Sequence, residues 1–254
     1  MYGEPTFVVL GGMAPVHAGR RSAASIDCPR DSEGRLVAWT EQHPTVLERL
    51  RSGGEFHADG RRVPRSVRPV FGWMRREMIE RVDGACGRSL IWLTVVPNLE
   101  RDRLCDWRCT RRTGELCSKV HITPGKDWIR VSISASRALV SDFAMWSERV
   151  MAYQYVPSDE ADAARWDRRL RSELHTPRGA ETPHPLSGTS ERTQRAVIAS
   201  WQRIFDVDPH AGRTIQATVE YLSIDDVIDV VRAPAPEDVP LPYNSNVSTY
   251  RRPI

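Results

Sequence analysis

The order of short apolar segments along this chain constrains its fold more than any other feature. Segments of strand length, such as Phe7–Leu10 and Leu90–Val96, alternate irregularly with stretches of helical periodicity. Regular alternation is typical of a doubly wound parallel sheet, whereas irregular order favours segregated strands and helices. The sequence therefore predicts a single α+β domain with a mixed or antiparallel sheet and flanking helices.

The periodicity of apolar residues predicts the individual elements. Strands are expected at Leu36–Thr40, Ser89–Val96, Trp128–Ser134 (half-exposed), Leu139–Val140 and Thr214–Leu222, with a short turn or strand at Ile224–Val231. Helices are expected at 45–52, Val70–Val82, Asp142–Tyr153 and Glu191–Phe205. No glycine-rich loop follows any of these strands, so a nucleotide site of the Rossmann or P-loop type is not expected.

The domain is expected to extend from Leu36 to Arg232. The other segments are an N-terminal strand and leader at 1–35, a cysteine-containing insert at 98–127, a proline-containing loop at 177–190 and an extended or disordered tail at 233–254. Proline and small polar residues bury too little apolar surface to order such segments.

Composition limits the compartment and the partners. The net charge is only +3 over 254 residues, so no global field drives binding to nucleic acid. All but two of the 36 basic residues are arginines, which suit bidentate contact with phosphate, but they are spread evenly. The chain opens without a basic signal-type region and no run is long enough to span a bilayer, so we expect a cytoplasmic protein with no membrane contact.

The cysteine insert contains a candidate metal site. Cys105, Cys109, Cys117 and His121 have the spacing C-x3-C-x7-C-x3-H. Structural zinc sites use four sulfur and nitrogen ligands of this kind, although this spacing is not one of the common finger patterns. The alternative is three reduced cysteines in a polar loop. An odd total of five cysteines does not favour a disulfide framework.

Six fragments, in order from about Leu36 to Arg232, together resemble an uncharacterised bacterial family known only as a domain of unknown function. The fragments are Trp39-Thr40-x-Gln42, Trp73-Met74-x-x-x-Met78, Ile91-Trp92, Leu139-Val140-Ser141-Asp142-Phe143-x-x-Trp146, Ser200-Trp201-x-x-Ile204-Phe205-Asp206 and Ile215-Gln216-Ala217-Thr218. The chain departs from the pattern after Ile91-Trp92, where the cysteine insert follows. The resemblance implies a fold and brings no established activity.

The opening strand is also similar to that of ADP-ribosyltransferases, which use NAD. This similarity implies that Thr40 and Gln42, with neighbouring His43, bind nicotinamide, and that Ser132 and Ser141 line the cleft. Gln216 or Glu220 would stand where that fold has its catalytic glutamate, which stabilises oxocarbenium-like charge. A neutral Gln216 suits this role less well. The alternative is that these residues are edge-strand polar groups and helix caps.

Asp142 has two interpretations. As the residue before a helix it is a good N-cap, and as a cleft residue it would act as an acid or base.

The sequence supports two hypotheses about function. The first is an enzyme acting on a nucleotide-like substrate, similar to an ADP-ribosyltransferase. The second is a zinc-stabilised module that binds nucleic acid or protein, in which arginines around the cysteines contact phosphate. The sequence does not define the oligomeric state.

Overall fold

A six-stranded sheet forms the centre of the structure, a computed structural model that describes residues 30–95, 125–173, 189–207 and 215–232, and the backbone of 104–106 and 120–122. The strand order is β6-β7-β2-β1-β5-β8, and all neighbours are antiparallel. The strands are β1 (Leu36–Gln42), β2 (Ile91–Val95), β5 (Asp127–Ile133), β6 (Leu139–Asp142), β7 (Ile215–Val219) and β8 (Val227–Arg232). The α+β single-domain prediction is confirmed, with the antiparallel form of the sheet.

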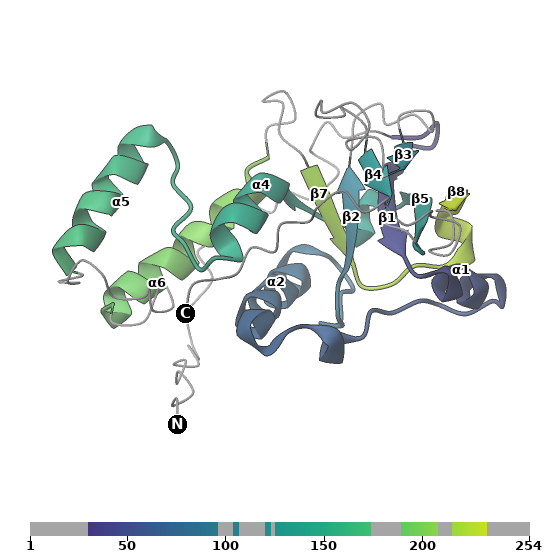
Figure 1. The fold of residues 1–254 in the computed structure, drawn as a ribbon, viewed down its shortest axis with the longest axis horizontal. Helices are drawn as coiled ribbons and strands as arrows, with labels where there is room; N and C mark the ends of the chain where they lie inside the picture. Colours follow the sequence, from purple (N-terminus) through teal and green to yellow (C-terminus); the bar gives the residue numbers. More distant parts are fainter. Residues whose placement is uncertain are drawn as a thin grey trace, which may run out of the picture.

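Five α-helices accompany the sheet in the described part of the chain. They are α1 (Pro44–Arg51), α2 (Arg68–Arg81), α4 (Phe143–Met145), α5 (Glu160–Glu173) and α6 (Glu191–Ser200). A π-helical turn at Trp146–Val150 continues α4, and a 3-10 turn at Trp201–Phe205 continues α6. Helix α6 lies between α5 and the sheet, so α5 is the outermost element on that side (Figure 1).

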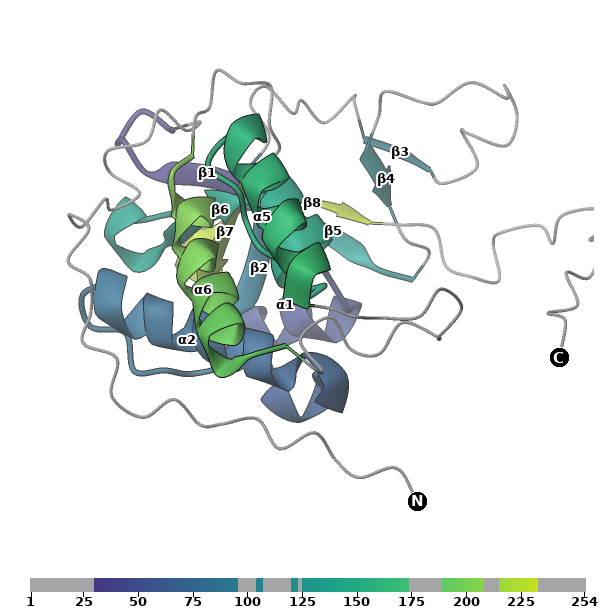
Figure 2. The same ribbon diagram turned by 90° about the vertical axis from the view of Figure 1, so that its left-hand side faces the viewer.

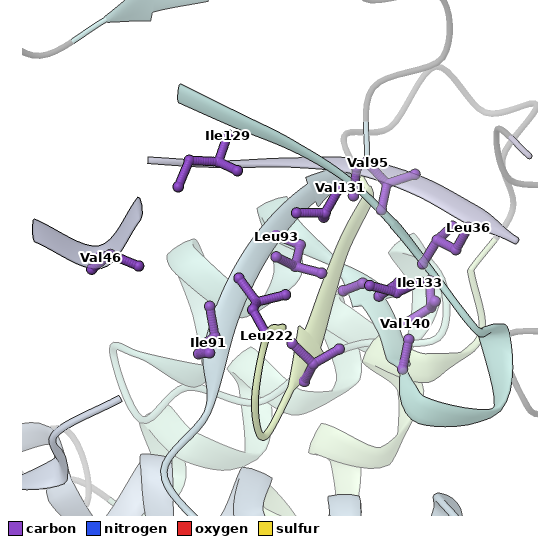
Figure 3. Close-up of a cluster of buried hydrophobic side chains, with 14 of the residues drawn as sticks. Leu36, Val46, Ile91, Leu93, Val95, Ile129, Val131, Ile133, Val140 and Leu222 are labelled. Atoms are coloured by element: carbon purple, nitrogen blue, oxygen red, sulfur yellow. The ribbon is translucent and has the colours of Figure 1, made fainter. Parts of the chain in front are cut away.

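One face of the sheet packs on α1. Side chains from four strands and from α1 point towards a common centre, including Leu36, Leu93, Ile129 and Val46 (Figure 3). Most of these side chains are almost wholly inaccessible to solvent. His43 is the N-cap residue of α1, and its ring nitrogen accepts the Thr45 N–H.

The opposite face packs on α2, α4 and α6. Leu139 and the partly buried Trp92 contribute from the sheet to this second cluster. Aromatic rings dominate it, since Trp73 contacts Trp201 at 5.4 Å and Trp92 contacts Trp146 at 4.7 Å between ring centroids. Among the tryptophans of the family-like fragments, Trp39, Trp73, Trp146 and Trp201 are buried, whereas Trp92 is half-buried.

The structure differs from the expected elements at three places. The strand at 127–133 is buried on both faces rather than half-exposed. Ile129, Val131 and Ile133 pack in the cluster with α1, and on the other face Trp128 packs on Trp39 and Ser132 binds Asp31. Ile79, expected on the buried face of α2, is 50% exposed. Helix α5 was not anticipated, and it has no buried residue.

Some expectations lie outside the described residues. These are the strand at 7–10, most of the loop at 177–190 and the tail beyond Pro234. Among the helices that the structure describes, none has the length and apolar character needed to cross a bilayer.

Candidate functional site

Thr40 and Gln42 lie on the face of the sheet that packs on α1. Thr40 pairs with Ile129, whose side chain belongs to the cluster packed between the sheet and α1, called the α1-side cluster below. The Thr40 hydroxyl donates to the Trp92 carbonyl at 2.9 Å, and the Gln42 amide nitrogen donates to the Thr40 hydroxyl at 2.8 Å. Both predicted nicotinamide-binding residues therefore interact with the sheet itself.

Ser141 and Gln216 lie on the other face. A register row runs across the sheet from Ser141 through Gln216 and Thr94 to Trp39. Directly paired residues of antiparallel strands share a face, and consecutive residues point to opposite faces. Thr40 therefore points away from this row. Because the strand period separates them, Thr40 and Gln42 do not converge with Ser141 and Gln216 on one cleft.

Ser141 and Gln216 are both buried, and their side chains are hydrogen-bonded to each other. The Gln216 amide nitrogen donates to the Ser141 hydroxyl at 3.0 Å, and the two side chains are 4% and 0% exposed. A paired buried amide of this kind holds neighbouring strands in register. Because both side chains are almost inaccessible to solvent, the pair does not present them to a ligand.

Glu220 follows β7 and stabilises the loop that precedes β2. Its carboxylate accepts the Cys86 N–H at 2.9 Å and the Arg88 N–H at 2.7 Å. Its own carbonyl lies 3.1 Å from the Nδ1 atom of His57. A buried carboxylate that accepts two backbone N–H groups is fixed in place. Glu220 therefore has a supporting role in this loop.

The remaining predicted residues also have local partners. Asp142 is the N-cap of α4 and accepts the Met145 N–H at 2.9 Å, as the capping interpretation predicts. The Ser132 hydroxyl donates to Asp31, and this bond holds the pKa of the Asp31 carboxyl below its usual range. His43 is the cap of α1 described above.

The cysteine insert falls largely outside the described residues. Cys109 and Cys117 are not part of the description, and for Cys105 and His121 it gives the backbone alone. Strands β3 (Leu104–Asp106) and β4 (Val120–Ile122) form a parallel pair in which Cys105 and His121 are register partners. In the described part of the chain, no group of three or more His, Cys, Asp or Glu residues could hold a metal ion.

A cleft lies between α5 and α6, lined by described residues of both helices and their neighbours. Polar contacts fix both ends of the helix pair. At one end, Glu173 accepts from the hydroxyls of Ser190 (2.9 Å) and Thr193 (2.7 Å), which also lowers the pKa of Glu173. At the other end, Arg203 donates to Asp162 at 3.0 Å. The two helices run side by side between these contacts (Figures 1 and 2).

Small residues keep the middle of this helix pair open. Ala196, Ala199 and Ser200 line the α6 side, so no large side chain fills the space. The resulting cavity has a volume of about 390 Å³. Cavities of roughly 300–1,000 Å³ accommodate ligands of drug size.

Three arginines and two aromatic rings line the rest of the cleft. The cationic lining residues are Arg165, Arg169 and Arg203, and Asp162 is the one acidic residue among them. The rings of Tyr155 and Trp166 stack with 4.1 Å between centroids and 6° between planes. The cleft therefore combines net positive charge with an aromatic wall.

Asp162 holds the inner part of the cleft together. It accepts the Ser158 N–H at 3.0 Å, which lowers the pKa of its carboxyl, and the Tyr155 hydroxyl at 3.0 Å. Arg203 is fixed by Asp162, whereas Arg165 has a 3.4 Å contact with it and a side chain that is 60% exposed. Arg165 is thus the more available of the two cations.

The sequence interpretation missed the residues of this cleft. The signal that could have found α5 is the segment Ala161–Arg171, which is rich in Ala and Arg, with Asp159 accepting the Asp162 N–H as a helix start. The family-like fragments drew attention to the strands. No pattern in the sequence shows that Arg203 and Arg165 come together.

An antiparallel six-stranded sheet with helices on both faces, and a cationic cleft at its helical end, defines an α+β architecture. The chain belongs to the family described as Domain of unknown function (DUF3841), whose model matches residues 37–228. No curated protein and no solved structure matches the chain.

Proposed function

We propose that the protein binds a nucleotide in the α5–α6 cleft. The observation that carries this proposal is the joint presence of Arg165, Arg169 and Trp166 in one cavity of about 390 Å³. A nucleotide needs cationic groups for its phosphates and an aromatic surface for its base, and these residue types supply both.

The phosphates would contact Arg165 and Arg169. The guanidinium is a planar donor that binds phosphate oxygens in pairs. Arg165 is largely exposed and only weakly held by Asp162, and the Nη2 atom of Arg169 has a neutral partner, the Thr193 hydroxyl, at 3.2 Å. Both side chains are therefore able to gain a charged partner.

The base would lie against the Tyr155–Trp166 pair in place of the arginines that cover it, since the guanidinium carbons of Arg169 and Arg203 lie 5.4 Å from the Trp166 centroid and 5.1 Å from the Tyr155 centroid. Stacking on an aromatic side chain contributes roughly 1–3 kcal/mol per base, without dependence on base identity. The tight stack of these two rings fixes their orientation before a ligand arrives. A prearranged wall lowers the entropic cost of binding.

The test is isothermal titration calorimetry with ADP on the full chain. Arg165→Gln together with Arg169→Gln should raise the Kd for ADP by about tenfold or more, because two charge-assisted contacts are lost. Arg168→Gln together with Arg171→Gln is the matched control, since both residues are on α5 and do not line the cleft. It should leave the Kd within about twofold at fixed ionic strength.

Two results decide against this proposal. One is equal weakening of ADP binding by the cleft pair and by the control pair. The other is a labelled single-stranded oligonucleotide that binds, with the same dependence on Arg165 and Arg169, while ADP does not. The second result would assign the cleft to nucleic acid.

NAD, the cofactor that the transferase resemblance implies, contains an ADP half and fits the same chemistry. ADP-ribosyl transfer is a separate proposal. It needs convergent groups around the nicotinamide ribose, and Thr40 and Gln216 point to opposite faces of the sheet. We therefore propose binding, and an NAD-hydrolysis assay on the purified protein tests the reaction.

A zinc site in the insert is a second candidate function. The observation that favours it is the register pairing of Cys105 with His121 across β3 and β4, which brings residues 16 positions apart to neighbouring backbones. Elemental analysis should find about one zinc per chain, lost in Cys105→Ser. A ratio near zero, with reactive thiols, would remove this candidate and leave the cleft proposal untouched.

A further inference from the structure

Another cavity in the described part of the chain lies beside α2. It is enclosed by the first half of α2, by the connection between α1 and α2, and by the residues just before β2. Its volume is about 220 Å³. The lining residues are Ala58, Asp59, Gly60, Val63, Arg68, Phe71, Gly72, Arg75, Ser89 and Leu90.

Two arginines at this cavity have no carboxylate partner among the described residues. Arg68 donates from Nε to the Val63 carbonyl at 3.1 Å, and Arg75 donates from Nε to the Gly87 carbonyl at 2.7 Å. Backbone carbonyls orient these guanidinium groups and leave their charge uncompensated. Each group also keeps donors that are free to bind an anion.

The acidic residue of the lining does not neutralise them. Asp59 binds Arg61 through both carboxylate oxygens, at 3.0 and 3.2 Å. These contacts lower the pKa of Asp59, so the carboxylate is ionised and already paired at neutral pH. The positive charge of Arg68 and Arg75 therefore remains available to a ligand.

Glycines make the space between these arginines. Gly72 is inside α2, where a glycine is unfavourable by roughly 0.5–1 kcal/mol relative to alanine. A Cβ atom at Gly72 would meet only the Nη1 atom of Arg76, at 4.0 Å, so nothing in the protein requires a glycine there. The absence of a side chain at this position opens the cavity.

The remaining walls are apolar. Phe71, Leu90, Ala58 and Val63 supply carbon surface, and Leu90 is buried. An apolar cavity of about 150 Å³ holds one benzene molecule. A space of about 220 Å³ thus has room for one ring and a small polar group.

We propose that this cavity binds a small organic acid with a single aromatic ring or a branched aliphatic body. Its carboxylate binds Arg68 and Arg75, and its body lies between Phe71 and Leu90 over Gly72. This inference does not depend on the nucleotide proposal, because the two cavities share no residue.

The experiment uses benzoate as the probe and benzamide as its neutral counterpart of the same shape. Ligand-observed NMR on the full chain should show saturable binding of benzoate, and benzamide should bind at least tenfold more weakly. That difference follows because two charge-assisted contacts to the carboxylate are missing.

Two variants locate the binding. Arg68→Gln with Arg75→Gln should weaken benzoate binding about tenfold or more. Arg62→Gln with Arg65→Gln removes the same charge from residues outside the lining and should change it little. Gly72→Leu adds a side chain to the cavity from a helical position where the Cβ atom itself meets nothing closer than 4.0 Å, and it should abolish benzoate binding in a folded protein that still binds ADP.

Several results would overturn the proposal. They are the absence of saturable benzoate binding, equal binding of benzoate and benzamide, equal effects of the two arginine pairs, or full benzoate binding by folded Gly72→Leu. Thermal unfolding of each variant separates loss of the site from loss of the fold. Loss of ADP binding alone would count against the α5–α6 cleft and leave this site in place.

Discussion

The polar residues of the sheet and those of the α5–α6 cleft differ in what surrounds them. On the sheet, Gln216 and Ser141 are almost wholly buried and satisfy each other. In the cleft, Arg165 is 60% exposed and its closest acidic contact is at 3.4 Å. A polar residue within a family-like fragment can therefore serve the fold, whereas an exposed cation such as Arg165 lies on an outer helix.

Two carboxylates, Glu77 on α2 and Asp162 in the α5–α6 cleft, lie in opposite environments. Burial raises the pKa of Glu77, on α2, although Arg81 and Gln202 bind it. Hydrogen bonds lower the pKa of Asp162, in the cleft. Burial removes water from the Glu77 carboxylate, whereas hydrogen-bond donors surround the Asp162 carboxylate.

The largest expected effect on stability comes from the sheet. Leu93 is 1% exposed at the centre of the α1-side cluster. Leu93→Ala should lower the free energy of unfolding by about 3 kcal/mol, since it leaves a cavity in a packed core. Urea denaturation measures this loss. Ile79→Ala, at a position 50% exposed on α2, is the control and should cost about 1 kcal/mol or less.

A smaller loss is expected from the buried polar pair. Gln216→Ala leaves the Ser141 hydroxyl without its partner and should cost about 1–2 kcal/mol. ADP binding should not change, because Gln216 is not part of the α5–α6 cleft. Reduced ADP binding at unchanged stability would place a ligand-binding group on the sheet. The conclusion that Gln216 serves only the fold would then be wrong.

The two carboxylates give stability profiles with opposite signs. The pKa of Glu77 in the folded protein lies above its ordinary value of 4.5. Between these two pKa values the folded protein binds more protons than the unfolded chain, so stability falls as the pH rises through that interval. Glu77→Gln should remove this fall. Urea midpoints of both proteins from pH 4.5 upward test it, and parallel profiles would refute the assignment.

The pKa of Asp162 lies below its ordinary value of 3.8. Its contribution to stability is therefore present above that value and is lost as the pH falls through the folded-state pKa. Asp162→Asn should show a weaker acid-induced loss than the wild-type chain. The same denaturation series, continued to lower pH, measures the difference.

Periodicity alone predicted most of the sheet. The strand at Leu36–Thr40 and the helix at Val70–Val82 were found within two residues of their bounds, because burial on one face leaves a pattern in the sequence. Burial of the strand at 127–133 on both faces was missed. That property depends on what packs on each face of the strand, as Trp39 does on Trp128, and such contacts join residues distant in sequence.

The candidate site could not be predicted in the same way. Arg165 and Arg203 are 38 positions apart, and only the packing of α5 on α6 brings them to one cavity. The even spread of arginines along the sequence concealed this grouping. Conversely, the hydroxyl and amide groups chosen on the strands looked functional because the sequence does not show that Ser141 and Gln216 are partners.

The smallest expected effects come from two glycines near α2, which test whether an open space is required by the fold. Gly72→Ala should stabilise the protein by about 0.5–1 kcal/mol, because the helix gains a better former and the added Cβ meets only Arg76 at 4.0 Å. Gly87 is the contrasting position. It has a φ of 74°, and a Cβ there would lie 2.8 Å from the Cδ1 atom of Ile79. Gly87→Ala should therefore destabilise the protein by about 1–2 kcal/mol. Thermal or urea unfolding of both variants measures the pair of signs. If Gly72→Ala also destabilised the protein, the cavity beside α2 would be a requirement of packing, and the case for a ligand there would lose its structural basis.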